Sequence, residues 1–400
     1  MVFLALFLFL GLNACHVPEI ACEDPLGCIA VERGDPVRIG AMVALSGSAS
    51  HLGQDSQRAI ELAILNRDNT LLDHRIELIV TDSGCDAKSA KVAAELVVED
   101  EDVIGIIGPT CSVSAETAVP LVNNLGLTLI SPSATASHLT ENPPSGFFRT
   151  IASNAYEARL AANFAFNQLN ARTAAIISDK TAVGDELQQT FATAFTEWGG
   201  QITYQNSIAP GDSETTQMLQ DASATQPDVL YLPMFEPEAN LIANRIPEIA
   251  AWQDTLLLGS TGLFSKRFPP DVGTLTINGM YILGPVLDDT SYTAYLARWL
   301  DRHEQPPQSP NNPYAYDAAN LLLDAIESAA QIDTRGNLLI GLHTMREALY
   351  ATKAYPGVTG ELSCSPQGDC AAPTGLGVYR ISLAEINENQ WPPELVWTPE

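Results

Sequence analysis

Two apolar runs, each followed by small polar residues, lie in the stretch 103–135 and constrain the fold more than any other part of this sequence. Residues 103–107 (V-I-G-I-I) form the first run, which is rich in β-branched side chains, and residues 127–130 (L-T-L-I) form the second. Continuous runs of this kind are typical of strands buried on both faces of a parallel sheet. The stretch therefore predicts two neighbouring parallel strands in an α/β fold.

Hydroxyl-bearing loops follow both predicted strands. Ser112 or Ser114 is expected to cap a helix that runs to about Asn124, and the loop 131–135 (S-P-S-A-T) follows the second strand. Both loops then open at the carboxyl ends of parallel strands, where open α/β sheets bind ligands. A helix amino terminus at that edge favours an anion such as a carboxylate. The simpler alternative is that these hydroxyl groups only cap helices.

The alternation of strand and helix covers most of the chain and restarts once, after N-P-P-S-G at 142–146. Two blocks of similar size predict two similar α/β lobes, each with a doubly wound parallel sheet. The predicted strands are 37–45, 75–81, 103–107 and 127–130, then 173–178, 201–207, 228–232, 255–258 and 279–283. The other predicted helices of the two blocks are 57–69, 86–99, 155–170, 184–198, 214–225 and 237–250.

Beyond the second block the pattern changes. Three helices without intervening strands cannot cover a sheet of their own, so we expect them to complete the two lobes. The tail 357–383 has the pattern of a β-hairpin whose tip carries Cys364 and Cys370. The three helices are 291–303, 313–331 and 337–352.

Acidic residues strongly outnumber basic ones. The 48 Asp and Glu residues against 20 Lys and Arg give a net charge of −28. Such a surface repels phosphate groups, which argues against nucleic acid as a partner and against docking on anionic lipid through a basic patch. A hydrophobic fraction of 46% is that of a globular chain, and 400 residues suffice for two domains.

The amino terminus has the pattern of a secretory signal. Residues 2–12 are almost wholly apolar, but the run is too short to span a bilayer. It ends in L-N-A-C, which resembles the lipobox of bacterial lipoproteins, in which cleavage precedes the cysteine and that cysteine carries the lipid. We therefore expect a signal peptide at 1–14, lipid on Cys15 and a linker at 15–36, so that only the lipid touches the membrane. The alternative is an ordinary cleaved signal with a free Cys15.

The other six cysteines fall into three pairs of sequence neighbours, and an oxidising compartment permits disulfides. Six cysteines allow fifteen pairings, so sequence alone does not decide among them. Cys85 and Cys111 each follow a predicted strand, which puts both at the same sheet edge and within bridging reach. The expected pairs are Cys22 with Cys28, Cys85 with Cys111, and Cys364 with Cys370.

Common motifs of catalysis and of cofactor or metal binding are missing from the sequence. It contains no G-x-S-x-G, H-E-x-x-H, G-x-x-x-x-G-K-[ST], G-x-G-x-x-G or C-x-x-C, and its six histidines are scattered. We therefore expect neither a metal nor a cofactor. A Ser112 nucleophile would have only His138 as a nearby base, and Asp179 and Glu236 would be the acid–base pair. A secreted hydrolase is thus the least favoured function.

Six short motifs follow one another between Val37 and Leu383. They are R-I-G-A-M-V-A-L-S-G (38–47), D-S-G-C-D-A-K (82–88), I-G-P-T-C-S-V-S (107–114), I-S-P-S-A-T-A (130–136), Y-A-Y-D-A (314–318) and G-V-T-G (357–360). Together they resemble the branched-chain amino-acid-binding family of bacterial ABC-transporter substrate-binding proteins, which have the type I periplasmic binding fold.

The resemblance implies a domain organisation. In that family the chain crosses between the lobes three times, which explains the helices without strands. It implies lobe 1 at 37–153 and 286–356, and lobe 2 at 154–285 and 357–400. The family cysteines that match Cys85 and Cys111 form a disulfide.

The resemblance also implies a ligand site between two closing lobes. The α-carboxylate of the ligand is held by the hydroxyl and backbone at the position of Ser112. The loop at the positions of Ser133, Ala134 and Thr135 completes that half of the site. These residue types are retained here, and the helix amino termini point to the same edge.

The other half of the site departs from the family. Leu52 and Val183 stand where the family often has tyrosine, and Phe235 keeps an aromatic ring. Thr261 replaces the acidic residue that pairs with the ammonium of the ligand. These changes predict a more apolar site, although Leu52 and Val183 have simple packing as an alternative role.

Loss of the acid affects the expected ligand. A buried ammonium without a counter-charge costs far more than one hydrogen bond returns. The sequence therefore predicts a small aliphatic or aromatic carboxylate or amide. An α-amino acid fits only if Glu236, Asp179 or Asp185 substitutes for the missing acid.

The expected function is the extracytoplasmic solute-binding component of an ABC importer, which closes on a small ligand and delivers it to permease subunits. We expect a monomer, either periplasmic or anchored to the outer face of the cytoplasmic membrane. A ligand-binding sensor that acts with a separate signalling partner is the alternative.

Overall fold

The computed structural model describes residues 20–99, 102–141, 146–209, 215–236, 238–266, 268, 274–287, 289–387 and 391–399. The expected signal peptide and the lipid-attachment residue Cys15 lie outside these ranges. Within them, none of the helices combines the length and the apolar character needed to cross a bilayer.

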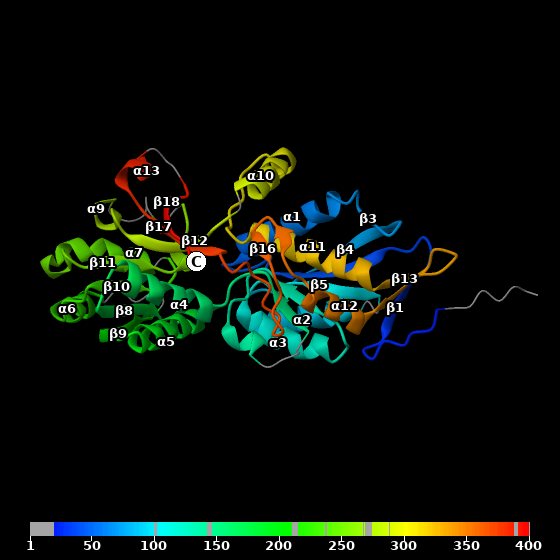
Figure 1. Cartoon of the computed structure of the whole chain (residues 1–400), viewed down its shortest axis with the longest axis horizontal. Helices are drawn as coiled ribbons and strands as arrows, with labels where there is room; N and C mark the ends of the chain where they lie inside the picture. Colours follow the sequence, from blue (N-terminus) through cyan, green and yellow to red (C-terminus); the bar gives the residue numbers. More distant parts are fainter. Residues whose placement is uncertain are drawn as a thin grey trace, which may run out of the picture.

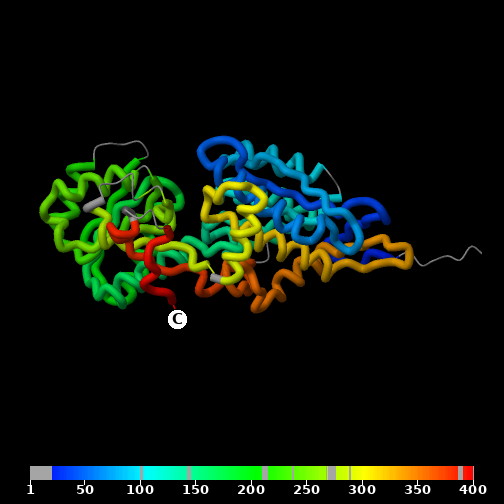
Figure 2. Tube along the Cα trace, turned by 90° about the horizontal axis from the view of Figure 1, so that it is seen from above, coloured from blue at the N-terminus to red at the C-terminus, as the bar shows by residue number. Residues whose placement is uncertain are grey.

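Two lobes lie side by side along the long axis of the molecule (Figures 1 and 2). One apolar core fills lobe 1, and two cores fill lobe 2, one on each face of its sheet. The chain passes between the lobes at 150–153, at 286–287 and at 373–375. The expected α/β fold with two lobes and three crossovers is confirmed.

Lobe 1 contains a six-stranded sheet in the order β3-β4-β2-β5-β6-β7, parallel except for β3. All five residues of β5 are buried, as expected for a central strand covered on both faces. Its strands are β2 (Val37–Val43), β3 (Thr70–Leu71), β4 (His74–Asp82), β5 (Val103–Ile107), β6 (Leu129–Ser131) and β7 (Phe147–Arg149). Its helices are α1 (Ser50–Leu65), α2 (Ala87–Val98), α3 (Ser112–Asn123), η1 (Ser137–Thr140), α10 (Asp289–His303), α11 (Asn312–Ala329) and α12 (Leu342–Tyr350).

Lobe 2 contains a seven-stranded sheet in the order β18-β17-β12-β11-β10-β8-β9, in which only β17 and β18 pair antiparallel. Its strands are β8 (Thr173–Asp179), β9 (Gln201–Ile208), β10 (Val229–Leu232), β11 (Leu256–Gly259), β12 (Tyr281–Pro285), β17 (Leu376–Arg380) and β18 (Glu394–Trp397). Its helices are α4 (Asn154–Asn163), η2 (Phe164–Gln168), α5 (Ala182–Glu197), α6 (Thr216–Ala224), α7 (Glu238–Arg245), η3 (Ile246–Glu248), η4 (Ala250–Trp252), η5 (Thr261–Leu263), α9 (Thr274–Ile277) and α13 (Leu383–Asn387).

A small antiparallel sheet at the far end of lobe 1 corrects two expectations. Its strands are β1 (Cys28–Val31), β14 (Leu338–Gly341) and β13 (Ala330–Ile332). The segment 15–36, expected to be a linker, therefore contributes a strand to lobe 1. The helix expected from 337 begins only at α12, because Leu338 and Ile340 point into the core with the period of a strand.

The tail also differs from the expected hairpin. Strand β16 (Gly360–Leu362) pairs with β15 (Tyr355–Gly357), whereas β17 joins the sheet of lobe 2. Residues Leu362, Cys364 and Cys370 pack into the core of lobe 1. The second part of lobe 2 therefore begins near β17 and not at residue 357, because the apolar side chains before β17 are buried in lobe 1.

Both parallel sheets share one strand order, which determines where a ligand can bind. The chain runs outward from β2 to β4 and then returns to the other side of β2 at β5. In lobe 2 it does the same from β8 to β9 and back to β10. Each reversal leaves a crevice at the carboxyl ends of two neighbouring strands, the usual ligand position in open α/β sheets.

Candidate ligand-binding site

The residues expected at the site follow strands at these two reversals or the strand next to them. In lobe 1, Leu52 lies in the first turn of α1 after β2, and Ser112 is the first residue of α3 after β5. The loop 133–135 follows β6. In lobe 2, Val183 lies in the first turn of α5 after β8, and Phe235 and Thr261 follow β10 and β11. The eight residues thus lie at the carboxyl edges of the two sheets.

The two loops of lobe 1 are bonded to one another. The Ser131 hydroxyl donates to the Pro109 carbonyl at 2.7 Å and accepts from the amides of Ser133 and Ala134 at 3.2 and 2.9 Å. The Ser133 hydroxyl donates to the Thr110 carbonyl at 2.7 Å. The Ser133 and Ala134 amides are therefore engaged within the loop, so these two residues shape the site rather than offer free donors.

Ser112 and Thr135 keep donors for a ligand. The Ser112 Oγ accepts from the Ala136 amide at 3.1 Å, which leaves its hydroxyl hydrogen free to donate. Among the described residues the Thr135 side chain has no hydrogen-bond partner. The helix cap differs from expectation, because Cys111 occupies the N-cap of α3 and the buried Ser114 hydroxyl donates to the Ser83 and Gly84 carbonyls.

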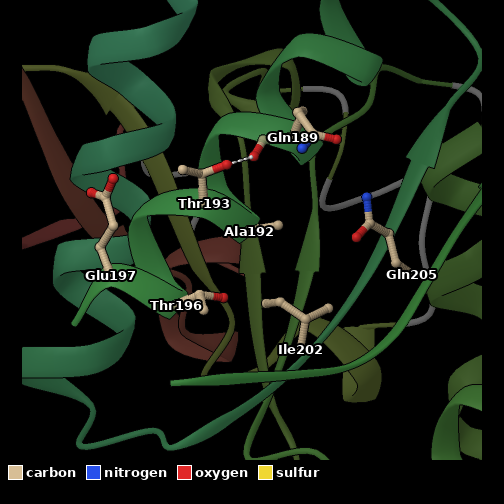
Figure 3. Close-up of a pocket in the computed structure, with 7 residues that line it drawn as sticks. All are labelled: Gln189, Ala192, Thr193, Thr196, Glu197, Ile202 and Gln205. Carbon is tan, nitrogen blue, oxygen red and sulfur yellow. Dashed lines mark hydrogen bonds between the residues drawn. The ribbon is translucent and has the colours of Figure 1, made fainter. Parts of the chain in front are cut away.

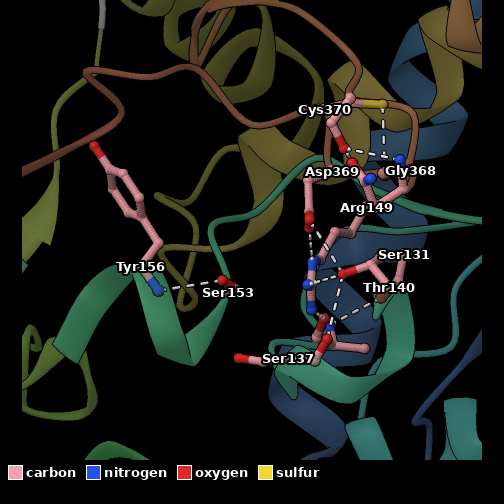
Figure 4. Close-up of polar contacts among 12 residues, drawn as sticks. Ser131, Ser137, Thr140, Arg149, Ser153, Tyr156, Gly368, Asp369 and Cys370 are labelled. Carbon is pink, nitrogen blue, oxygen red and sulfur yellow. Dashed lines mark hydrogen bonds and ion pairs between the residues drawn. The ribbon is translucent and has the colours of Figure 1, made fainter. Parts of the chain in front are cut away.

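Arg149 supports this loop through hydrogen bonds (Figure 4). Its side chain is buried, and its guanidinium donates to the Ala136 carbonyl at 2.7 Å and to the Thr140 hydroxyl at 2.5 Å. Its Nε pairs with the Asp369 carboxylate. The Arg149 carbonyl accepts from the Cys370 amide at 2.8 Å. The segment closed by the Cys364–Cys370 disulfide thus holds the loop that carries Thr135.

Leu52 is positioned by a close approach of α1 to β2. A Cβ on Gly53 would lie 1.9 Å from the Ala44 carbonyl oxygen, so only glycine fits there. The half-buried Leu52 side chain is therefore set at the start of the helix, which begins seven residues before the expected position 57.

In lobe 2 the buried carboxylate of Asp179 organises the edge. Its Oδ2 accepts from the Phe235 amide at 3.1 Å, and its Oδ1 accepts from the Thr181 amide at 3.2 Å and from the Thr181 hydroxyl. The Thr181 hydroxyl in turn caps α5 by accepting from the Gly184 amide at 3.0 Å. Asp179 therefore fixes the turns that carry Val183 and Phe235.

Thr261 binds an acid that sequence reasoning missed. Both its amide and its hydroxyl donate to the Glu157 carboxylate at 2.7 Å. Glu157 lies on α4, and its side chain is 5% exposed. Burial raises the pKa of this carboxyl above its usual value, although the hydrogen bonds from Thr261 act in the opposite direction. One signal was present: Glu157 stands three and four residues before the buried Leu160 and Ala161, on the apolar face of its helix.

The first turns of α4 and α5 connect the two halves of the site. The Asn154 amide donates to the Thr135 carbonyl at 2.9 Å. The Glu186 carboxylate on α5 accepts from the Asn154 side chain at 2.7 Å and from the Ser137 amide of lobe 1 at 3.0 Å. Hydrogen bonds of Asn154 and Glu186 thus link the residues after β6 in lobe 1 to α4 and α5 of lobe 2.

A separate pocket of about 500 Å³ lies between α5 and β9 (Figure 3). Ile202, one of its lining residues, pairs with Ala174 near the start of β8. The pocket is therefore at the amino ends of these strands, opposite the edge that carries the expected site residues. The residues that line it are Gln189, Ala192, Thr193, Thr196, Glu197, Ile202 and Gln205.

The structure joins the cysteines in the three pairs expected from the sequence, Cys22–Cys28, Cys85–Cys111 and Cys364–Cys370. The described residues contain no cluster of three or more side chains suited to a metal ion. His138, the base considered for Ser112, lies 3.1 Å from the Glu116 carboxylate at the surface.

Comparison with known proteins identifies the family of this chain. Residues 36–385 match the family model described as periplasmic binding protein. The chain belongs to the periplasmic binding protein family. This agrees with the resemblance on which the domain organisation was predicted, and it supports an extracytoplasmic location.

Relatives of this periplasmic binding protein include two curated bacterial proteins. The Leu/Ile/Val-binding protein BraC3 of Rhizobium johnstonii is 24% identical over 88% of this chain and 93% of its own length. The leucine-, isoleucine-, valine-, threonine- and alanine-binding protein of Pseudomonas aeruginosa is 23% identical over 84% of this chain and 87% of its own.

Solved structures share the fold. The substrate-binding protein LivJ of Streptococcus pneumoniae, in complex with isoleucine, has a TM-score of 0.75 at 20% identity and covers 91% of this chain and 100% of its own. A solute-binding protein from R. palustris in complex with 4-hydroxybenzoate has a TM-score of 0.77 at 17% identity, with 92% and 97% covered. This periplasmic binding protein therefore has the type I fold that the sequence predicted.

Proposed function

We propose that this protein is the solute-binding component of an ABC importer, which binds a small carboxylate-bearing ligand between its lobes and delivers it to permease subunits. The observation that carries the proposal is that the residues expected at the site lie at the carboxyl edges of both sheets, at or next to the reversals of strand order, and that hydrogen bonds from α4 link the two edges. Two relatives are named as binding proteins for amino acids, and a solved structure of the same fold contains 4-hydroxybenzoate. Both kinds of molecule are small carboxylates, which supports the proposed ligand class.

The ligand carboxylate is assigned to lobe 1. The Ser112 and Thr135 hydroxyls donate to it, and the amino terminus of α3 adds a favourable dipole. The apolar body of the ligand is assigned to Leu52, Val183 and Phe235. Phe235 is 44% exposed, and a large apolar side chain at a sheet edge is a surface that a ligand covers favourably.

The proposal includes a lipid anchor at Cys15 and no catalytic role. The anchor is supported by the apolar run at 2–12 and by L-N-A-C. A non-catalytic role is supported by the contacts of the two candidate catalytic groups. The Ser112 hydroxyl accepts from a backbone amide, and His138 faces Glu116.

A calorimetric titration of the oxidised protein tests the proposal, with leucine, 4-methylpentanoate, benzoate and 4-hydroxybenzoate as probes. We expect at least one to bind, and we expect Ser112→Ala and Thr135→Ala each to weaken that binding. Thr117→Ala is the matched control, because it removes a hydroxyl from the same helix that donates only to the Val113 carbonyl. Absence of binding to all four probes, or equal affinity of the three variants and the wild type, contradicts the proposal.

A further inference from the structure

The residues around Thr135 in lobe 1 cap the first helix of lobe 2. The Thr135 carbonyl accepts from the Asn154 amide, and the Ser137 hydroxyl accepts from the Ala155 amide, both at 2.9 Å. The first amides of a helix have no acceptor within the helix, so they need one from elsewhere. Figure 4 shows Ser137 near Ser153, the N-cap of α4. The loop that carries Thr135 therefore supplies part of the cap of a helix in the other lobe.

Glu186 on α5 adds a contact between this loop and a second helix of lobe 2. Its Oε1 accepts from the Ser137 amide at 3.0 Å, and its Oε2 accepts from the Asn154 side chain at 2.7 Å. Each oxygen of the carboxylate is thus engaged by a different lobe. Because α5 follows the crossover at 150–153 only after α4 and β8, this contact joins the lobes through a part of lobe 2 that the crossover does not hold directly.

The same loop is held from the side of lobe 1. The Ala136 amide donates to the Ser112 Oγ at 3.1 Å, and the Ala136 carbonyl accepts from the Arg149 guanidinium at 2.7 Å. Any movement of Ala136 therefore acts on Ser112 and on the adjacent Thr135, the two donors assigned to the ligand carboxylate. These contacts form a continuous path between the orientation of lobe 2 and the geometry of the carboxylate site.

We propose that Glu186 is a positioning residue that clamps the loop 135–137 of lobe 1 to lobe 2 and so limits the relative orientations of the two lobes. This inference rests on the proposed function, in which the ligand lies between the lobes. Glu186 acts through the loop and does not touch the ligand. Because the two halves of the site must face one ligand together, a protein that is less often in that orientation binds every ligand more weakly by the same factor.

Pulsed electron paramagnetic resonance on the ligand-free protein tests the clamp directly. Spin labels on Lys91→Cys of α2 and Gln220→Cys of α6, both at exposed positions, report the distance between the lobes. We expect Glu186→Ala to broaden the distribution of this distance, because the loop loses its bond to α5. Glu197→Ala is the matched control: it removes an exposed carboxylate of the same helix that pairs with Arg159 of α4 within lobe 2, and it should leave the distribution unchanged.

A conservative variant tests whether the clamp consists of hydrogen bonds. In Glu186→Gln the new side-chain oxygen can accept from the Ser137 amide, and the new amide group can donate to the side-chain oxygen of Asn154 once that amide is turned over. We therefore expect Glu186→Gln to keep the narrow distribution of the wild type. A distribution as broad as that of Glu186→Ala overturns a hydrogen-bonded clamp. Glu186 is only half-buried, so we expect both variants to fold.

Calorimetry with the probes named above measures the consequence for binding. For each probe that the wild type binds, Glu186→Ala should weaken binding by about threefold to tenfold, with the same factor for leucine and 4-methylpentanoate. Glu186→Gln and Glu197→Ala should both keep the affinity of the wild type. Loss of one ligand alone would make Glu186 a ligand contact and overturn the inference.

The distance measurement needs no ligand, so failure of this inference and failure of the proposed function are distinguishable. Equal distributions in the wild type and Glu186→Ala overturn the clamp, whatever the probes do. Binding of none of the probes contradicts the proposed function, and the distance distributions then decide on the clamp alone. A lower free energy of unfolding in Glu186→Ala, with unchanged distances and affinities, makes the residue a structural support only and also overturns the inference.

Discussion

The two lobes share a strand order, but their ligand edges are held by different means. In lobe 1, small hydroxyl residues bond to neighbouring loops, and disulfides and Arg149 brace them. All six paired cysteines belong to lobe 1, whereas lobe 2 contains no cysteine. In lobe 2 two buried carboxylates, Asp179 and Glu157, organise the edge by accepting hydrogen bonds from the turns around them.

The two lobes therefore differ in how far their ligand edges depend on ionisable groups. Disulfides, hydrogen bonds between neutral groups and the Arg149–Asp369 ion pair hold the two site loops of lobe 1, so its edge offers a fixed set of donors to an anion. Lobe 2 depends on carboxylates, whose ionisation responds to pH and to the charge of a ligand. We therefore expect lobe 1 to bind the part of the ligand that is common to a class and lobe 2 to discriminate within that class.

Removal of the Cys85–Cys111 disulfide should have the largest effect on stability. The bridge spans 26 residues, and the chain-entropy model gives roughly 3.5 kcal/mol for such a loop. Urea unfolding of a Cys85→Ser, Cys111→Ser variant checks this value. The control is the Cys22→Ser, Cys28→Ser variant, whose six-residue spacing gives roughly 2 kcal/mol. A smaller loss for the longer loop would mean that covalent bracing is not what distinguishes lobe 1.

Removal of the carboxylate that pairs with Arg149 should come next. Asp369→Ala leaves a buried guanidinium with neutral partners only. The Asp369 carboxylate is 39% exposed and therefore screened by solvent, so we expect a loss of about 1–3 kcal/mol, less than for a fully buried pair. We expect weaker ligand binding as well, because Arg149 supports the loop that carries Thr135. Urea unfolding and calorimetry measure both effects. Glu197→Ala is the control: it breaks the exposed ion pair with Arg159 and should lower the free energy of unfolding by less than about 1 kcal/mol. Similar losses of stability in the two variants would show that Arg149 does not depend on Asp369 for its support of the loop.

The pH dependence of stability should reveal a buried acid of lobe 1. Asp317 on α11 accepts from the Val358 and Thr359 amides, both at 2.9 Å, and burial raises its pKa from 3.8 to about 6. The folded protein therefore binds this proton more tightly than the unfolded chain. Stability from this group is complete below about pH 4 and falls as pH rises through about 6, by at most about 3 kcal/mol.

Chemical denaturation between pH 4 and 7 measures this slope. Asp317→Asn should flatten it, whatever the absolute stability of the variant, because the titrating group is removed. Asp24, for which burial raises the pKa but three backbone hydrogen bonds lower it further, contributes stability that is lost only as pH falls below about 4, so it does not affect the slope in this range. An unchanged slope in Asp317→Asn would show that the loss of stability comes from other acids.

The strands around the candidate site could be predicted from sequence, and the buried acid that binds Thr261 could not. Residues 103–107 have the predicted bounds because a strand buried on both faces is a continuous apolar run. The hydroxyl loops were found because their residues are adjacent in sequence. Glu157 was missed because its partner Thr261 is 104 residues away, and only the folded sheet brings them together. The helix expected from 337 shows the same limit, since β14 is defined by pairing with the distant β1.

Ser112→Ala should weaken binding of the ligand carboxylate by about tenfold. The variant loses one hydrogen bond to a charged group, which contributes about 1.5 kcal/mol, while the Ala136 amide loses its acceptor. Binding of both leucine and 4-methylpentanoate should fall by the same factor, because both carry the carboxylate. Calorimetry with the two ligands checks this equality. A selective loss of leucine would move the discrimination from lobe 2 to lobe 1.

Phe235→Ala should have the smallest effect and should separate the apolar contact from the charged one. Phe235 is 44% exposed, so its removal leaves no cavity and should change stability by less than about 0.5 kcal/mol. Binding should weaken by roughly threefold to tenfold, because the ligand loses the ring that covers its apolar body. Leucine and 4-methylpentanoate should lose affinity by the same factor, because they share the same apolar body. Leu395→Ala, which removes an apolar side chain of 42% exposure from β18 of the same lobe, should leave binding unaltered. If Phe235→Ala weakened only one of the two ligands, the ring would contact more than the apolar body that they share.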